Sequence, residues 1–380
     1  MSAAGGLSPA RLWAMVVKEF IQVSRDRLTF AMILGIPLMQ LVVFGLVINT
    51  DPRHMPAAIV MADNGPQART LLHGLKSSSY FDFERVLESE EEGAQLLRRG
   101  QVQFVVSIPE NFSRDLLRGD RPDVLVEADA TDPTAISGGL AALDGVINTA
   151  MLADFKGPLA RLAPQPPAIE MRVHALYNPE AITHYNIVPG LMGVVLTMTL
   201  VLITGLAITR ERERGTMENL LAMPLRPTEV LLGKITPYIF VGYIQVALIL
   251  LAARYLFDVP IHGNLALLLL ASLFFIAANL AMGITFSTIA KNQLQAMQMS
   301  VFVFLPSILL SGFLFPFRGM PAWAQVIGEI LPITHFIRIA RGVMLKGIGF
   351  DELGRELWPI ALFALVALTL GVKRYRQTLD

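Results

Sequence analysis

The 380-residue chain has no cysteine. Disulfide bonds, Cys-ligated zinc, iron–sulfur clusters and thiol catalysis are therefore excluded. Charged residues are also scarce: Asp, Glu, Lys and Arg make up 16% of the sequence, whereas a soluble globular protein has about a quarter. Because 53% of the residues are hydrophobic and the mean hydropathy is +0.53, the composition indicates a protein that is partly solvated by lipid.

The formal net charge is zero, but the charges are unevenly distributed along the chain. Residues 49–183 contain 12 Lys and Arg against 19 Asp and Glu, a net charge of −7, which leaves +7 for the rest. An acidic block inside a basic chain indicates two physical environments.

Six apolar windows are long enough to cross a bilayer as helices, which takes about 20 residues. They are Thr29–Ile48, Tyr185–Thr209, Leu231–Phe257, Leu265–Ala290, Gln298–Phe317 and Leu357–Val372. No small-residue cleavage site follows the first window, so we interpret it as a retained anchor. Lys234 and Arg254 lie near the ends of the third window, where long side chains can extend to the membrane interface.

Lys and Arg are concentrated beside three of these windows, and this bias predicts the orientation. They precede the first window and follow the second and the sixth: Arg11, Lys18, Arg25 and Arg27; Arg210, Arg212, Arg214 and Arg226; Lys373, Arg374 and Arg376. With six crossings these flanks share one side, so we predict that both termini are cytoplasmic. Residues 318–355 do not fit this pattern, because they place five basic residues on the predicted outer face.

The predicted fold class is a mainly α membrane protein with six transmembrane helices plus an extracytoplasmic α/β domain. The predicted segments are an interfacial amphipathic helix (1–28), transmembrane helix 1 (29–49), the extracytoplasmic domain (50–183) and transmembrane helices 2–6 (184–380), with a coupling helix at 210–224 and an outer re-entrant segment at 316–355. In the outer domain, strands are predicted at Ala57–Ala62, Phe81–Leu87, Val102–Ile108, Val124–Ala128 and Ile169–Tyr177, and helices at Gln67–Leu75, Glu90–Arg99, Glu110–Arg118 and Pro133–Phe155.

The sequence lacks its own energy source. A phosphate-binding loop needs Gly-Lys followed by Ser or Thr, but Gly233-Lys234 is followed by Ile235 and lies in a predicted membrane helix. Proton-driven carriers need ionisable residues at membrane depth, and none of the six windows has an Asp, Glu, Lys, Arg or His at its centre. No His pair has metal-ligand spacing on an evident helix or strand, so no metal site and no catalytic residue is predicted.

Two cytoplasmic segments have an amphipathic pattern. In the first, Trp13, Val16, Val17 and Phe20 recur at helical spacing, while Arg11, Lys18, Gln22 and Arg25 are predicted to face away. This pattern predicts a helix lying on the inner membrane surface. The pattern alone leaves open whether this helix is only an anchor or also contacts a partner.

The second segment follows the second window. Gly215 can end the membrane helix, and Thr216 can cap a short new helix with Glu218 in its first turn. Its apolar face would consist of Met217, Leu220 and Leu221, and Pro224 and Pro227 would end it. The pattern is compatible both with a short helix that receives force from a soluble partner and with an ordinary solvated loop.

The motif Glu213-x-Gly215-Thr216-x-Glu218-x-Leu220-Leu221, followed by Pro224 and Arg226-Pro227, closely resembles the coupling helix of type-2 ABC transporter permeases (the ABC-2 type). Further resemblances to this family, and to its members with a large domain after the first span, are Lys18-Glu19-Phe20-Ile21-Gln22, Phe104 to Ser113, Tyr177-Asn178-Pro179 and the stretch Met320 to Gly347 with Pro332, His335 and Arg341. Together these cover nearly the whole chain in order.

The resemblance implies an inner-membrane permease that binds no cofactor directly. In this family the coupling helix docks on a separate cytoplasmic ATPase, which binds ATP and Mg, and two ATPases serve two permeases. The second permease would be an identical copy or a sister chain, a periplasmic adaptor and membrane lipids are further candidate partners, and nothing indicates nucleic acid. The coupling residues carried over from the family are Glu213, Gly215, Thr216, Glu218, Leu220 and Leu221, and the apolar pattern adds Met217 to them. The residues assigned to the interfacial helix are Lys18, Glu19, Gln22 and Arg25.

The leading hypothesis is an ATP-driven exporter of an amphipathic or hydrophobic substrate such as a drug, a lipid or a lipid-linked molecule, because the windows offer no central charge to bind an ion. The substrate path is not identified by the sequence. The alternative, from another functional class, is a membrane-anchored receptor or assembly scaffold whose outer domain binds a ligand. An apolar face flanked by charges and prolines in the cytoplasm favours the exporter.

Overall fold

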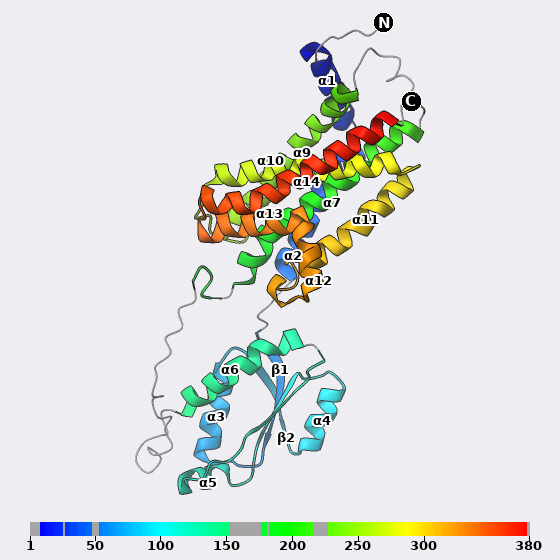
Figure 1. The fold of residues 1–380 in the computed structure, drawn as a ribbon. Helices are drawn as coiled ribbons and strands as arrows, with labels where there is room; N and C mark the ends of the chain where they lie inside the picture. Colours follow the sequence, from blue (N-terminus) through cyan, green and yellow to red (C-terminus); the bar gives the residue numbers. More distant parts are fainter. Residues whose placement is uncertain are drawn as a thin grey trace. The chain divides into compact units, whose positions relative to one another are not determined.

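The computed structural model describes residues 8–25, 27–47, 53–131, 133–151, 176–180, 182–213, 215 and 227–377. They form two compact units, one of Met1–Ile48 together with Leu176–Asp380 and one of Asn49–Ala175. The second unit covers most of the segment predicted as the outer domain. Figure 1 shows it as a small sheet with helices and the first unit as a helical bundle.

The smaller unit is an α/β domain built on a four-stranded sheet in the order β2-β1-β3-β4. β1 pairs in parallel with β2 and β3, and β4 runs antiparallel to β3. Its elements are β1 (Met55–Met61), α3 (Pro66–Ser77), β2 (Phe81–Leu87), α4 (Glu90–Arg98), β3 (Phe104–Ile108), α5 (Phe112–Arg118), β4 (Leu125–Ala128) and α6 (Pro133–Met151).

The domain has a core on each face of its sheet, because successive side chains of a strand point to opposite faces. Ile59 belongs to the face packed with Leu71 of α3 and Leu143 of α6, whereas Val60 belongs to the face packed with Leu96 of α4. The α/β prediction is confirmed, with four strands and four helices close to their predicted positions. Most of the fifth predicted strand, Ile169–Tyr177, lies outside the described residues, and its last two residues are not in a strand.

The larger unit is helical. Its elements are α1 (Pro9–Arg25), α2 (Arg27–Val47), α7 (Thr183–Glu213), α9 (Pro227–Tyr255), α10 (Leu265–Ile289), α11 (Gln293–Leu310), η2 (Phe317–Gly319), α12 (Ala322–Ile330), α13 (Pro332–Arg341), the π-helical turn η3 (Gly342–Lys346) and α14 (Phe350–Gln377). Five of the described helices, α7, α9, α10, α11 and α14, are long and apolar enough to cross a membrane. The 21-residue helix α2 occupies the first predicted window and carries a shorter apolar stretch, Ile33–Leu46.

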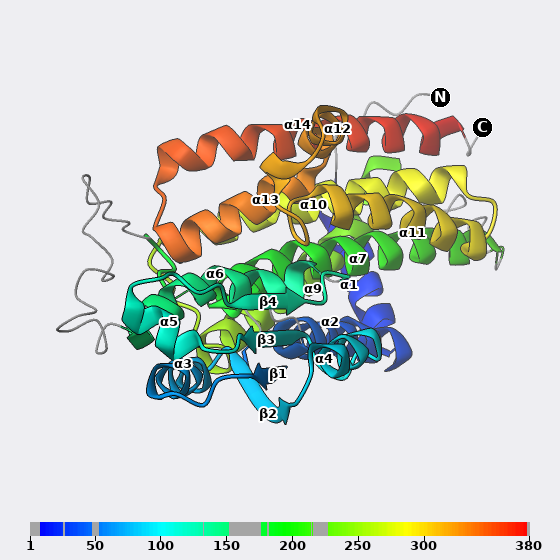
Figure 2. The ribbon, with the colours of Figure 1, turned by 90° about the horizontal axis from the view of Figure 1, so that it is seen from below.

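Helix α7 is the centre of this bundle. It contacts α2, α9, α10, α11 and α13, and α14 packs along α10 (Figure 2). Leu191, Val195 and Leu196 of α7 are fully buried against these neighbours. An apolar helix with apolar neighbours on all sides is typical of the interior of a membrane bundle.

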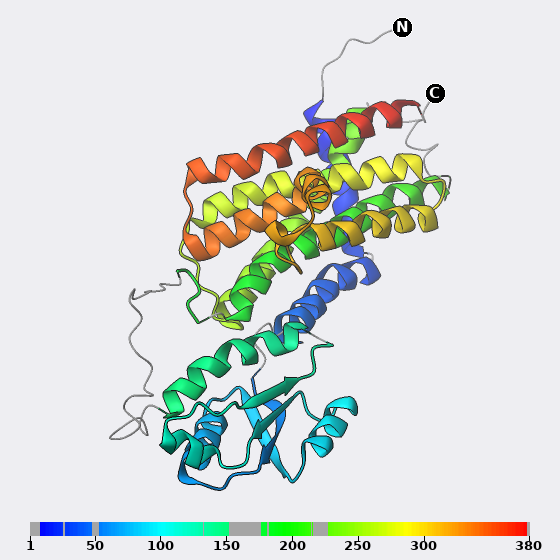
Figure 3. The same cartoon turned by 60° about the horizontal axis from the view of Figure 1, so that its bottom comes forward.

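The fifth window was predicted with wrong boundaries. Helix α11 begins at Gln293, after Asn292 accepts a hydrogen bond from the N–H of Gln295 at 2.8 Å, and it ends at Leu310 instead of Phe317. It ends there because Gly312 adopts a φ of +80°, in the left-handed region that few residues other than glycine enter. The chain then folds into the short helices α12 and α13, which lie between α11 and α14 (Figure 3).

Candidate functional site

The predicted interfacial helix, α1, packs on the start of α9. Met15 and Val16 are buried in this contact. Gly233 of α9 makes the close approach possible, because a Cβ atom there would lie 2.5 Å from Cγ of Met15. The Gly-Lys pair at 233–234, which fails as a phosphate-binding motif, therefore has a packing role in this helix contact.

Two buried carboxylates bind α1 to α9. Glu19, 2% exposed, accepts hydrogen bonds on Oε1 from Nζ of Lys18 at 2.9 Å and Nζ of Lys234 at 3.3 Å. Glu229, whose side chain is fully buried, accepts on Oε1 from Nη2 of Arg11 at 3.0 Å and from the N–H of Ser8 at 2.9 Å. Charges at this depth are stable only when paired and hydrogen-bonded, so α1 is fixed to the bundle by electrostatics as well as by packing.

These contacts bear on the polar residues predicted at the two helices. The side chain of Lys234 is 5% exposed and is paired with Glu19 of α1. The prediction that Arg11 faces away from the packed side of α1 was wrong, because Arg11 binds Glu229 of α9. Arg25 is exposed, as predicted, and the side chain of Gln22 lies outside the described residues.

The apolar face predicted for α1 is divided in the structure. Val16 faces α9, whereas Trp13, Val17 and Phe20 are exposed, Trp13 at 69%. The ring of Phe20 meets that of Phe240 edge-on, with centroids 5.4 Å apart. An exposed aromatic and aliphatic stripe on a helix docked at the end of a membrane bundle fits the interfacial position that the sequence predicts.

The end of α7 is anchored to the beginning of α11. The carboxylate of Glu213 accepts hydrogen bonds from the side chain of Gln293 and, at 2.8 Å, from its backbone N–H. These two bonds, the side-chain bond first, hold the pKa of Glu213 below its ordinary value. Arg212 donates to the carbonyl of Ala290 at 3.4 Å. The base of the predicted coupling helix is therefore bound to two transmembrane helices.

Gly215 ends α7 as predicted. Its φ is +68°, and its N–H donates to the carbonyl of Arg212 at 3.2 Å. Pro227 is the first residue of α9, which begins four residues before the predicted third window. Thr216, Met217, Glu218, Leu220 and Leu221 lie outside the described residues, so their coupling role stays a prediction.

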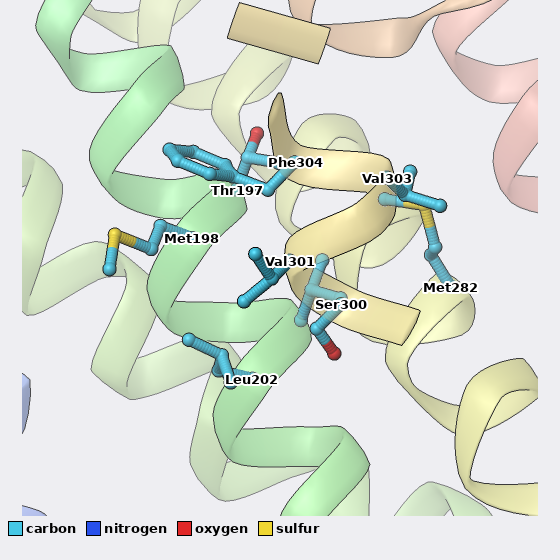
Figure 4. A pocket seen from close by; sticks show the side chains of 9 residues that line it. Thr197, Met198, Leu202, Met282, Ser300, Val301, Val303 and Phe304 are labelled. Carbon is cyan, nitrogen blue, oxygen red and sulfur yellow. The ribbon is translucent and has the colours of Figure 1, made fainter. Parts of the chain in front are cut away.

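A few uncharged polar side chains lie inside the bundle. Thr199 of α7 donates to Oε1 of Gln245 of α9 at 2.8 Å, and Nε2 of Gln245 donates to the carbonyl of Ile33 in α2 at 2.9 Å. A cavity between α7, α10 and α11 has a volume of about 30 Å³ and an almost entirely apolar lining, including Met198, Leu202 and Phe304 (Figure 4). A water molecule needs about 10–15 Å³ of such space, so the cavity has room for about two waters and cannot admit a drug-sized molecule.

The sequence analysis missed a charged cluster on α12, α13 and α14. Nδ1 of His335 lies 2.6 Å from Oε2 of Glu356, and Nε2 lies 2.9 Å from the carbonyl of Glu329. Arg338 binds Oε1 of Glu329 at 2.6 Å, and Arg341 donates to the carbonyls of Asn186 at 3.2 Å and Gly312 at 3.0 Å. The signal was present in the sequence, since His335, Arg338 and Arg341 recur every third residue, but no window included them.

Comparison with known proteins gives evidence on the family of this chain that is independent of its structure. Residues 27–373 match the family described as ABC-2 family transporter protein. The "Probable multidrug ABC transporter permease YbhS" of Escherichia coli K12 is 31% identical over 345 residues, 90% of each chain. The corresponding "YbhR" protein is 27% identical over 368 residues, 97% of this chain and 98% of its own. "ABC transporter G family member 20" of Dictyostelium discoideum is 24% identical over 362 residues, 92% of this chain and 48% of its own.

Proposed function

The chain belongs to the ABC-2 transporter family, and from this premise we propose that it exports an amphipathic or hydrophobic substrate from the cytoplasm or the inner leaflet. Members of this family are membrane permeases and not enzymes, and ATP is hydrolysed by a separate subunit. The observation that carries the proposal is the family match over 27–373, which includes the motif at 213–221.

The coupling step is assigned to residues 213–224. Met217, Leu220 and Leu221 would dock on a cytoplasmic ATPase that binds ATP and Mg. The anchoring of Glu213 to Gln293 supports this assignment, because a push on the segment would reach α7 and α11 directly. Two copies of the ATPase would drive two permeases.

The substrate path is assigned to the interface between two permeases, either identical copies or sister chains. The small volume of the cavity between α7, α10 and α11 supports this, because that cavity cannot admit a drug-sized molecule. The uncharged polar groups around Gln245 and the names of the bacterial relatives, which describe multidrug permeases, support an apolar or amphipathic substrate such as a drug.

The proposed location is the inner membrane, with both termini in the cytoplasm and the α/β domain outside. The positive flanks of the first, second and sixth windows support this orientation. Helices α12 and α13 then form a re-entrant hairpin in the outer half of the membrane. The outer domain would receive substrate or bind a periplasmic adaptor.

The test is reconstitution in inside-out vesicles. Permease and its ATPase together should accumulate an amphipathic fluorescent dye only when ATP is added, and permease alone should not. Accumulation without the ATPase, or none with it for any amphipathic dye tested, would contradict the proposed function.

A further inference from the structure

A groove with a charged lining lies along α12, α13 and α14. Its volume is about 890 Å³, within the range of small-molecule sites. Its charged lining residues are Arg318, Glu329, Arg338, Lys346, Glu352, Arg355 and Glu356. The basic residues among them outnumber the acidic ones by four to three.

Two of the three carboxylates in the groove are neutralised by the protein itself. Arg338 binds Glu329 with two nitrogens, at 2.6 and 3.1 Å, and reaches Glu356 at 3.4 Å. Both ring nitrogens of His335 face acceptors, the carboxylate of Glu356 and the carbonyl of Glu329. Only an imidazolium can donate to both at once, so this side chain adds a second positive charge opposite Glu356.

Two further cations of the groove are available to a ligand. Arg318 and Arg355 are exposed, and neither forms an ion pair with any residue in the part of the chain that the structure describes. Glu352, the third carboxylate, accepts a hydrogen bond from the N–H of Gly349 at 3.1 Å. A guanidinium presents a planar fork of donors that matches phosphate oxygens.

The groove also adjoins an apolar surface. Gln325 and Glu329 are one turn apart on α12 and line the groove, whereas Trp323, Val326 and Ile330 of the same helix are 63–65% exposed. Phe317 adds an aromatic wall, with Cζ of Arg338 4.6 Å from its ring centroid. A headgroup among the charges and an apolar chain along α12 would satisfy both surfaces.

We propose that this groove binds the phosphate-bearing headgroup of an amphiphile, held by Arg318 and Arg355, with the apolar part of the ligand along α12. The amphiphile is either a lipid of the surrounding bilayer or a molecule being exported. The inference rests on the proposed function only for the position of α12–α14 in the membrane.

The test uses the purified full-length permease without its ATPase, so that a failure here is distinct from a failure of coupling. Binding of dioleoylphosphatidylglycerol and of dioleoylphosphatidylcholine is measured by native mass spectrometry. Arg318→Gln and Arg355→Gln should each weaken phosphatidylglycerol binding about tenfold, the size of one lost charge-assisted hydrogen bond. The matched control is Lys373→Gln, an exposed cation at the other end of α14, which should leave binding unchanged.

Three results would overturn the inference. One is unchanged phosphatidylglycerol binding in both arginine variants. Another is equal loss in the Lys373 control, which would indicate diffuse attraction to charge. The third is binding of soluble glycerol 1-phosphate as tight as that of phosphatidylglycerol, which would assign the groove to a free phosphate ester.

A second experiment distinguishes a bilayer lipid from an exported molecule. Labelled phosphatidylglycerol is followed in vesicles that contain the permease and its ATPase. ATP-dependent movement identifies the lipid as cargo, and stationary binding identifies it as a structural lipid.

Discussion

Glu19 of α1 and Lys234 of α9 form a buried ion pair between residues 215 positions apart, with Oε1 and Nζ 3.3 Å apart. Both side chains are at most 5% exposed. The pair fixes the interfacial helix to the bundle at the end where the coupling segment emerges, so movement of α9 and α1 is linked.

We predict that breaking this pair destabilises the protein. Lys234→Met leaves the carboxylate of Glu19 with Lys18 as its remaining pair, and loss of one partner of a buried pair costs about 3–5 kcal/mol. The double variant Glu19→Leu/Lys234→Met should be more stable than Lys234→Met alone, because it removes the buried carboxylate of Glu19 together with its partner. Thermal unfolding in detergent measures the stability of both variants, and Lys373→Met is the control at an exposed lysine. If the effects of Glu19→Leu and Lys234→Met on stability simply add, the two side chains are not energetically coupled and the prediction is contradicted.

The second prediction concerns pH and the α/β domain. Partial burial opposes ionisation of Asp63, but hydrogen bonds from Ser113, including its N–H at 2.6 Å, and from the N–H of Gly65 at 2.9 Å outweigh it. The pKa of Asp63 is therefore below its ordinary value of 3.8. A lowered folded pKa stabilises the fold above the unfolded value and loses that effect as the pH falls through the folded value.

Asp63→Asn should therefore loosen the contact between β1 and α5 at neutral pH, and the difference from the wild type should shrink as the pH falls below about 4. The loosening is measured by hydrogen exchange of peptides covering residues 61–68 and 112–118 in the intact protein, at neutral pH and below about pH 4. A difference between variant and wild type of the same size at both pH values would show that the charge of Asp63 does not stabilise this contact.

The third prediction is the topology. Because the natural chain has no cysteine, single cysteines report cleanly. Ser77→Cys and Ser137→Cys should react with an impermeant maleimide in intact cells, and Thr378→Cys should react only after the membrane is opened. Labelling of Thr378→Cys in intact cells would contradict a cytoplasmic C-terminus.

The fourth prediction is the energy source. Since the sequence offers no Asp, Glu, Lys, Arg or His at the centre of its apolar windows, transport should survive a proton uncoupler as long as ATP is maintained. Dye efflux is measured in cells with the uncoupler, with and without ATP depletion. Loss of transport with the uncoupler alone would favour a proton-driven carrier.

Local signals explain why the α/β domain could be predicted. The helix predicted from Glu90 begins at that residue as α4, where Ser89 accepts the N–H of Glu92 at 3.3 Å, and β3 is a short continuous run of buried residues, Phe104–Ile108. The end of α11 could not be predicted in this way, because the apolar run continues beyond Gly312 and only the φ of this glycine ends the helix.

Long-range pairing was not visible in the sequence. Lys234 lies in an apolar run, and only the folded bundle brings Glu19 to it. His335 and Glu356 are likewise brought together by the antiparallel packing of α13 and α14. A search for long apolar windows shows that the windows lack central charges. It does not show charges that neighbouring short helices, such as α12 and α13, bring to the bundle.

The central claim is that residues 216–221 transmit force from an ATPase. Leu220→Asp places a charge on the predicted docking face, and Glu218→Arg reverses the charge at the helix start. An unpaired buried charge costs several kcal/mol, which weakens a modest interface by orders of magnitude.

The most direct measurement is co-purification of the ATPase with Leu220→Asp permease, together with ATP-driven dye transport, at wild-type levels of permease in the membrane. Gln377→Arg is the cytoplasmic control, outside the coupling segment. The account predicts that Leu220→Asp and Glu218→Arg lose both ATPase and transport while Gln377→Arg keeps both. Normal recruitment and transport by Leu220→Asp would show that the segment is an ordinary loop.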